Sequence, residues 1–146
     1  MKRKEFIKTL GCSLLAAPFA LQLLQSCDSL YYAKSETKDG QIILDKSSFL
    51  KSETSKKSYR NFVLLHNAVA GFPICVYRFS EDEYVASLLR CTHQGCELDV
   101  QAATYVCPCH GSEFSTRGKL LEGPAENDLQ NFPIHIENEK LYINIS

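Results

Sequence analysis

The 146-residue chain lacks the concentrated positive charge of a nucleic-acid-binding protein. Its formal net charge is −1. Four basic residues and one acidic residue place +3 within residues 1–8, which leaves −4 for the remainder of the chain. That remainder has no basic patch interleaved with aromatic residues, so the sequence excludes nucleic acid as an expected partner.

The chain also lacks a helical apolar period and a recognisable catalytic group. After residue 27 no segment shows the sustained 3.6-residue spacing of apolar residues that an amphipathic helix requires. No nucleophile paired with a base and no acid–base pair can be identified. We therefore expect a protein with few helices and without a catalytic centre of its own.

Short runs of β-branched and aromatic residues predict strands instead. These runs are Gln41–Leu44, Asn61–Leu65, Ile74–Phe79, Tyr84–Leu89, Phe132–Glu137 and Leu141–Ile145. The last two bracket residues 138–140, which is the spacing of a hairpin. We expect an all-β fold over residues 41–146, an antiparallel sandwich or partly open barrel. Residues 90–125, approximately, are expected to form a loop-built subdomain that carries the functional site.

Residues 1–26 have the pattern of an export signal. A basic beginning is followed from Thr9 by an uncharged apolar stretch, and small or polar residues precede Cys27. The segment RKEFIK, residues 3–8, resembles the twin-arginine motif with lysine in place of the second arginine. Both the twin-arginine route and the general secretory route therefore stay open.

The segment LQSC, residues 24–27, resembles the lipobox of bacterial lipoproteins. In those proteins a peptidase cuts before the cysteine and the thiol carries diacylglycerol, so Cys27 is the expected lipidation site. The alternative is an uncleaved signal helix from Thr9 to Cys27, which is near the lower length limit for a membrane span. Either interpretation places the protein in the bacterial cell envelope, exported and membrane-anchored, with residues 27–40 as a polar tether.

Six side chains that can bind metals are concentrated in two boxes. The first is CTHQGC at residues 91–96, and the second is CPCH at residues 107–110. An exported protein meets an oxidising environment, in which surplus paired cysteines become disulfides. Four metal ligands and one disulfide therefore account for all six side chains. Cys75, outside the boxes, is expected to be a small buried apolar residue.

The two boxes, with GSEF at residues 111–114, resemble the paired boxes of the Rieske [2Fe-2S] proteins. The GPA segment at residues 123–125 is similar to the proline-containing loop that this family places beside its cluster. The resemblance implies a [2Fe-2S] cluster with two thiolates on one iron and two imidazoles on the other. The implied ligands are Cys91, His93, Cys107 and His110. It also implies a disulfide between Cys96 and Cys109 that ties the two cluster loops together.

The same resemblance assigns roles to residues around the cluster. Ser112 corresponds to a serine whose hydroxyl donates to a bridging sulfide and stabilises the reduced state. Phe114 stands where quinol-oxidising members carry a tyrosine that donates to a cysteine ligand, and phenylalanine cannot donate, so a lower reduction potential is implied. Gly95 and Gly111 are expected where backbone passes close to the cluster, because glycine has no Cβ. Pro124 belongs to the loop beside it.

A structural zinc site is the competing interpretation, because zinc accepts two cysteines and two histidines. It does not account for Cys96, Cys109, the Gly-Ser pair after His110 and the proline loop together. We therefore expect iron, and redox activity would distinguish the two metals.

The resemblance implies a membrane-associated, extracytoplasmic electron-transfer protein. It would pass single electrons between a quinol or partner oxidoreductase and a cytochrome b or c type acceptor. The alternative is the small subunit of a periplasmic molybdenum oxidoreductase of the arsenite oxidase type, with a molybdopterin subunit as partner. Phe114 and the short N-terminal anchor favour this alternative, whereas the imperfect Arg3-Lys4 pair counts against it. A dioxygenase ferredoxin is disfavoured, because those proteins are cytoplasmic and lack the disulfide pair.

Overall fold

The computed structural model describes residues 30–52, 57–66 and 71–146, and this part of the chain is almost entirely β. The elements are β1 (Glu36–Lys38), β2 (Gln41–Asp45), the 3-10 turn η2 (Lys46–Phe49), β3 (Leu50–Ser52), β4 (Ser58–Tyr59), β5 (Phe62–Leu65), β6 (Ile74–Arg78), β7 (Tyr84–Leu88), β8 (Asp99–Val100), β9 (Thr104–Val106), β10 (Glu113–Ser115), β11 (Leu120–Glu122), β12 (Asn131–Phe132), β13 (Ile134–Glu137) and β14 (Lys140–Asn144). The predicted export signal and Cys27 lie outside the described residues. Within the described ranges, no helix has the length and apolar character needed to cross a membrane.

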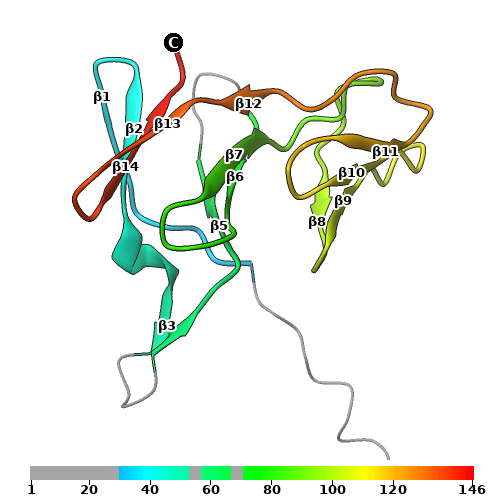
Figure 1. Ribbon diagram of the computed structural model, residues 1–146. Coiled ribbons are helices and arrows are strands. Elements are labelled where there is room, and N and C mark those ends of the chain that lie inside the picture. The colour runs from blue at the N-terminus through cyan, green and yellow to red at the C-terminus, as the bar shows by residue number, and fades with distance from the viewer. Residues whose placement is uncertain (1–29, 53–56, 67–70) are drawn as a thin grey trace, which may run out of the picture.

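Three four-stranded antiparallel sheets build the described part of the chain (Figure 1). The outer sheet has the order β1-β2-β14-β13, the central sheet β12-β7-β6-β5, and the site sheet β11-β10-β9-β8. A short β3-β4 ribbon completes the set. The sheets do not close into a barrel, so the prediction of an all-β, partly open fold is confirmed. The predicted terminal hairpin is also confirmed, with β13 paired to β14 around residues 138 and 139.

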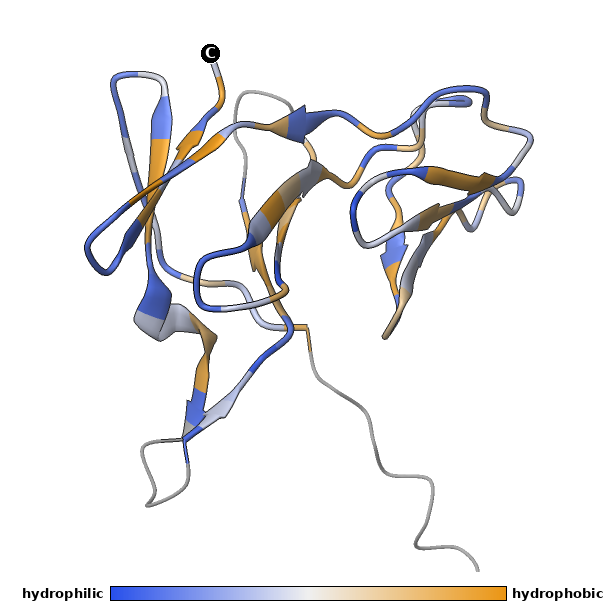
Figure 2. Ribbon diagram, in the orientation of Figure 1, coloured by the Kyte–Doolittle hydropathy of each residue, from blue (hydrophilic) through white to orange (hydrophobic). Residues whose placement is uncertain are grey.

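The central sheet is buried on both faces, because alternate residues of a strand point to opposite sides. In β6, Ile74 and Val76 pack toward the outer sheet, in one core with Leu44, Leu141 and other residues of β2 and β14. Burial of each such aliphatic side chain contributes about 1.5–3 kcal/mol. Figure 2 shows the corresponding hydrophobic colouring in the outer and central sheets, with hydrophilic residues at the turns.

The opposite face of the central sheet packs against the site sheet and forms a second core. Leu64 of β5 and Cys75 of β6 belong to it, together with Tyr105 of β9 and Phe114 of β10. These four side chains are almost completely buried. The subdomain that carries the two boxes is therefore fixed to the rest of the fold through an apolar layer of its own.

The chain joins the fold alongside β5. Tyr32 forms a parallel bridge with Leu64. The amide of Ala33 donates to the Leu64 carbonyl at 2.9 Å, and the Leu64 amide donates to the Tyr31 carbonyl at the same distance. The sequence predicts a polar tether here, but Tyr31 and Ala33 are hydrogen-bonded to the central sheet. Farther along the same stretch, β1 pairs with β2 and extends the outer sheet.

Candidate metal centre

Both cysteine boxes adopt the same closed backbone loop. In the first, the Cys91 amide donates to the Cys96 carbonyl at 2.8 Å, and the Gly95 amide donates to the Cys91 carbonyl at 2.9 Å. In the second, Cys107 makes the same pair of bonds with the Ser112 carbonyl and the Gly111 amide, at the same distances. This equivalence of the two loops is not among the features predicted from the sequence. A cysteine followed four residues later by glycine, which occurs in both boxes, was the signal for it.

Gly95 and Gly111 have positive φ angles, +77° and +79°. This left-handed conformation is unfavourable for residues with a Cβ atom, so glycine is required to turn each loop back on itself. A Cβ at Gly111 would meet nothing within 4 Å, whereas one at Gly95 would lie 3.1 Å from Nε of Arg90. The predicted importance of these glycines thus has a conformational reason in both loops.

Cys91 and Cys107 belong to the second core, and each residue is only 2% exposed. Burial raises the pKa of the Cys107 thiol, but a hydrogen bond with Cys91 and bonds from the amides of Cys109 and His110 outweigh that effect and lower it below the ordinary value. Backbone N–H groups aimed at a sulfur favour its anionic form. Such a sulfur is suited to bind a metal as thiolate.

The imidazoles of His93 and His110 lie together on the surface. Their ring centroids are 5.0 Å apart, and the ring planes are perpendicular. Both residues are exposed. The two boxes therefore present two sulfur donors on the inner side and two nitrogen donors on the solvent side of one small region.

A disulfide joins the boxes. Cys96 and Cys109 are bonded; their Cα atoms are 6.5 Å apart, and the residues are 13 positions apart in sequence. The predicted disulfide is confirmed. The sulfur atoms of Cys96, Cys107 and Cys109 lie within 4.8 Å of one another. Cys96 and Cys109 are bonded to each other, so these three cysteines do not form a three-thiolate metal site. The disulfide, called the clamp below, instead lies next to the free thiol of Cys107.

The proline loop is attached to both boxes by side-chain hydrogen bonds. Ser112, which is completely buried, accepts from the Ala125 amide at 3.0 Å, and its own proton stays available for donation. Thr92 donates to the Asn127 carbonyl at 2.7 Å. The sequence analysis singled out Ser112 but missed Thr92. These contacts tie the loop to both boxes at Ala125 and Asn127, and Pro124 within it is exposed.

A family model described as the Rieske [2Fe-2S] domain matches residues 50–133, which is more than half of the chain. The chain belongs to the Rieske [2Fe-2S] domain family. The cytochrome b6-f complex iron-sulfur subunit of Chlorobaculum tepidum is 30% identical over 82 residues, 49% of this chain and 45% of that protein. The subunit of the same description from Prochlorococcus marinus strain MIT 9211 is 40% identical over 55 residues, 36% of this chain and 31% of that protein. The chain thus spans less than half the length of these relatives.

Solved structures show the same fold. The plasma membrane Rieske protein PetC3 of Synechocystis PCC 6803 is 28% identical, with a TM-score of 0.50 over 57% of this chain and 85% of that one. A chain of the carbazole 1,9a-dioxygenase complex of reduced oxygenase and oxidized ferredoxin reaches a TM-score of 0.51 over 73% of this chain and 94% of that one. At 19% identity, this second likeness shows the fold alone.

The donor set of this Rieske domain fits a [2Fe-2S] cluster, which is the family's cofactor. Two buried thiols and two exposed imidazoles match one iron with sulfur ligands and one with nitrogen ligands. Zinc would leave the clamp and the attached proline loop without a role. The family assignment therefore favours the iron–sulfur interpretation over the structural zinc site.

Phe114 and Tyr105 form the floor of the Rieske site. They are paired across β10 and β9, and both are completely buried in the core that contains Cys91 and Cys107. Tyr105 shares a hydrogen bond with Cys75, whose thiol is also fully buried. Burial raises the pKa of Cys75 to about 12. Cys75 is thus a neutral core residue, as predicted, and not a fifth donor.

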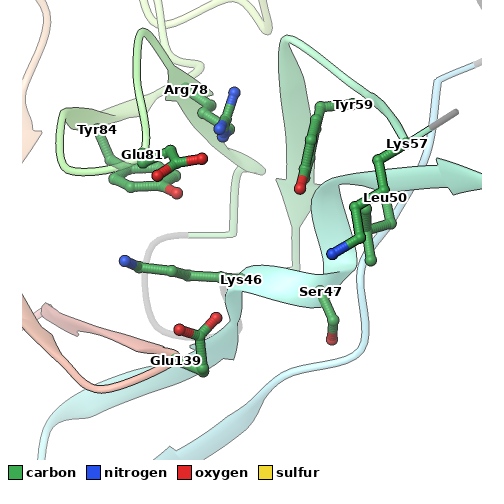
Figure 3. Close-up of a pocket in the computed structure, with 9 residues that line it drawn as sticks. All are labelled: Lys46, Ser47, Leu50, Lys57, Tyr59, Arg78, Glu81, Tyr84 and Glu139. Carbon is green, nitrogen blue, oxygen red and sulfur yellow. The ribbon is translucent and has the colours of Figure 1, made fainter.

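A separate cavity of about 240 Å³ lies between η2, the β3-β4 ribbon and the turn after β6 (Figure 3). Its lining includes Lys46, Arg78, Tyr84 and Glu139, and none of the two boxes' residues. Lys46 is also 3.8 Å from Asp82 as an ion pair. Charges of both signs therefore surround this cavity, which has no part in the Rieske site.

Proposed function

We propose that this Rieske protein is a membrane-associated, extracytoplasmic one-electron carrier. It passes electrons between a quinol or partner oxidoreductase and a cytochrome-type acceptor. The observation that carries the proposal is the position of the two imidazoles, which are exposed at the end of an otherwise buried donor set. The similarity to cytochrome b6-f iron–sulfur subunits supports a cytochrome as partner. A molybdopterin subunit is the second candidate, supported by Phe114 in place of a hydroxyl donor.

The proposed ligands are Cys91, His93, Cys107 and His110. The bound [2Fe-2S] cluster supplies a centre that accepts and releases one electron. The protein's own residues determine how that centre is presented. The two closed loops and the disulfide hold the ligands in fixed positions, so little reorganisation accompanies a change of charge. The core beneath excludes water from the thiolates, while the exposed imidazoles offer the short contact that an electron-transfer partner needs.

Electron paramagnetic resonance tests this assignment directly. Protein reduced with dithionite should give a rhombic signal with an average g value below that of all-cysteine [2Fe-2S] clusters. Nitrogen ligands on one iron make the reduced centre electronically asymmetric, which is the reason for this expectation. A spectrum of the all-cysteine type, or bound zinc without iron, would refute the ligand set.

Lipidation of Cys27 is the proposed means of membrane attachment. Replacing Cys27 by serine should abolish incorporation of labelled fatty acid, and it should either leave the precursor uncleaved or alter its retention in the membrane fraction, because two or more acyl chains supply stable anchoring. Labelling that persists in the variant, or that is absent from the wild type, would instead favour the uncleaved signal helix.

Phe114 offers a test of redox tuning. In Phe114→Tyr the added phenol lies within the core that contains the cysteine ligands, where a sulfur is an available acceptor. A donor to a ligand sulfur stabilises the reduced state, so the reduction potential should rise within the family range of roughly −150 to +300 mV. Phe132→Tyr, in the other core, is the matched control and should leave the potential unchanged. Equal potentials in all three proteins would mean that Phe114 does not face a ligand.

A further inference from the structure

An aromatic and cationic patch lies where the chain joins the fold. The described residues expose five large apolar side chains, and three of these are consecutive. They are Leu30, Tyr31 and Tyr32, which are 56%, 37% and 39% exposed. Exposed apolar side chains grouped in this way mark a contact surface more often than scattered ones do.

The rings of this patch are held in place by neighbours on and around β5. The Tyr32 ring stacks on the His66 ring with centroids 4.3 Å apart and planes 12° from parallel. The Arg60 guanidinium lies 4.1 Å from the centroid of the Tyr31 ring. The backbone bonds of Tyr31 and Ala33 to Leu64 fix the same segment. Tyr31, Tyr32, Arg60 and His66 are therefore ordered along the β5 edge of the central sheet. Together with the exposed Leu30 they are named here the basal patch.

The basal patch carries positive charge only. The two segments that build it, residues 30–35 and 57–66, contain Lys34, Lys57 and Arg60 and no aspartate or glutamate. Aromatic rings with an apolar body and a polar edge, flanked by basic residues, are the composition that proteins place at membrane–water interfaces. A layer of anionic lipid headgroups is complementary to this charge.

The position of the basal patch in the chain also favours contact with a lipid surface. Only three residues separate Cys27 from Tyr31 in sequence. Four successive residue steps span at most about 14 Å even when fully extended. An anchor at Cys27 therefore keeps the basal patch within that distance of the lipid surface.

We propose that the basal patch is a membrane-contacting face that seats this protein on anionic lipid, with Tyr31, Tyr32 and His66 at headgroup level. This inference rests on the membrane attachment proposed above. A second copy of the chain is the less suitable occupant, because pairing two basal patches would bring like charges together without a compensating carboxylate.

This orientation on the membrane determines the direction in which the cluster site faces. Figure 1 shows the described chain beginning just below β5, whereas the loops after β7 and β9, which hold the two boxes, lie at the upper right. With the basal patch on the lipid and a link of three residues, the paired histidines face the aqueous side. The exchange partner is then a protein that approaches from that side, in preference to a quinol within the bilayer.

Single-tryptophan reporters test the inference, since the wild-type chain contains no tryptophan. The full-length protein is purified from membranes and reconstituted into vesicles of phosphatidylcholine and phosphatidylglycerol, with and without bromine on the acyl chains. His66→Trp reports on the basal patch from a position far from Cys27 in sequence. Leu30→Trp reports on attachment. Leu121→Trp, 58% exposed in β11 beside the proline loop, is matched to Leu30 in residue type and exposure.

We expect brominated lipid to quench the fluorescence of Leu30→Trp and His66→Trp by roughly twofold, with a blue-shifted emission, because both side chains lie at the interface. Leu121→Trp should show no lipid-dependent quenching. Each variant should keep the paramagnetic resonance signal of the wild type, which verifies the fold and the cluster.

Three outcomes would overturn the inference, and they are distinguishable. An unquenched Leu30→Trp means that the proposed attachment itself fails. A quenched Leu30→Trp with an unquenched His66→Trp means that the protein is attached but its basal patch is not on the lipid; a blue shift that grows with protein concentration in detergent would then identify a second copy as the occupant. Quenching of Leu121→Trp as strong as that of His66→Trp means that the cluster side faces the membrane.

Discussion

Replacing Cys107 by alanine should yield a colourless protein without iron, whereas the same replacement of Cys75 should leave the [2Fe-2S] cluster in place. Both residues belong to the core beneath the site, and each change removes one sulfur atom from it. They differ in the environment of that sulfur. Backbone amides and Cys91 stabilise the Cys107 thiolate and lower its pKa, while burial keeps Cys75 neutral with a pKa of about 12.

The measurement is iron content together with the visible and paramagnetic resonance spectra of the purified variants. We expect two iron atoms per chain for the wild type and for Cys75→Ala, as a [2Fe-2S] cluster requires, and none for Cys107→Ala. Since Cys75 is fully buried, its replacement tests whether a general loss of stability is enough to release the cluster. Iron retained in Cys107→Ala, or lost from Cys75→Ala, would require a different ligand set.

The second large effect is expected at the clamp. The double replacement of Cys96 and Cys109 by serine should give a protein that assembles its cluster but loses it much faster on warming. A bond that closes a loop of this length, with its ends 13 positions apart, stabilises a fold by about 3 kcal/mol. Both histidine-bearing loops are exposed, so opening between them gives solvent access to the ligands.

The decay of visible absorbance at several temperatures measures this effect. The half-life of the cluster should shorten by roughly tenfold or more in the double variant, in line with the lost stabilisation. Wild-type protein treated with a thiol reductant is the control and should decay like the variant. Equal half-lives for variant and wild type would mean that the loops stay closed without the disulfide. If thiol counting found both Cys96 and Cys109 reduced in the native protein, the proposal of a disulfide clamp would be refuted.

Much of the site was predictable because its chemistry depends on residue types at short spacings. The donor atoms, the disulfide pair and the proline loop lie within residues 91–125, and each box is a local turn whose geometry follows from a cysteine and a glycine four positions apart. Thr92 could not be found in this way. Its role depends on the carbonyl of Asn127, which is 35 positions away in sequence.

The strands could be predicted for a similar reason, since alternation and β-branched residues are local signals. Their arrangement could not. The run Ile74–Arg78 reads as an apolar strand, but the sequence does not say that Ile74 and Val76 face one core while Cys75 faces another. Residues 31–38 illustrate the same limit, because their polar composition predicts a tether and gives no sign of the hydrogen bonds to β5.

The sequence by itself determined the all-β class, the two boxes that supply the proposed donor set of a Rieske cluster, and the presence of an N-terminal segment with the pattern of an export signal. Only the tertiary structure decided which side chains of that set are buried and which are exposed. It alone brought the Tyr31–Tyr32 segment next to Arg60 and His66, about 30 positions later in the chain. The physical reason is that burial and charge density depend on pairing between distant strands, which hydrogen bonds and apolar packing select only when the whole chain has folded.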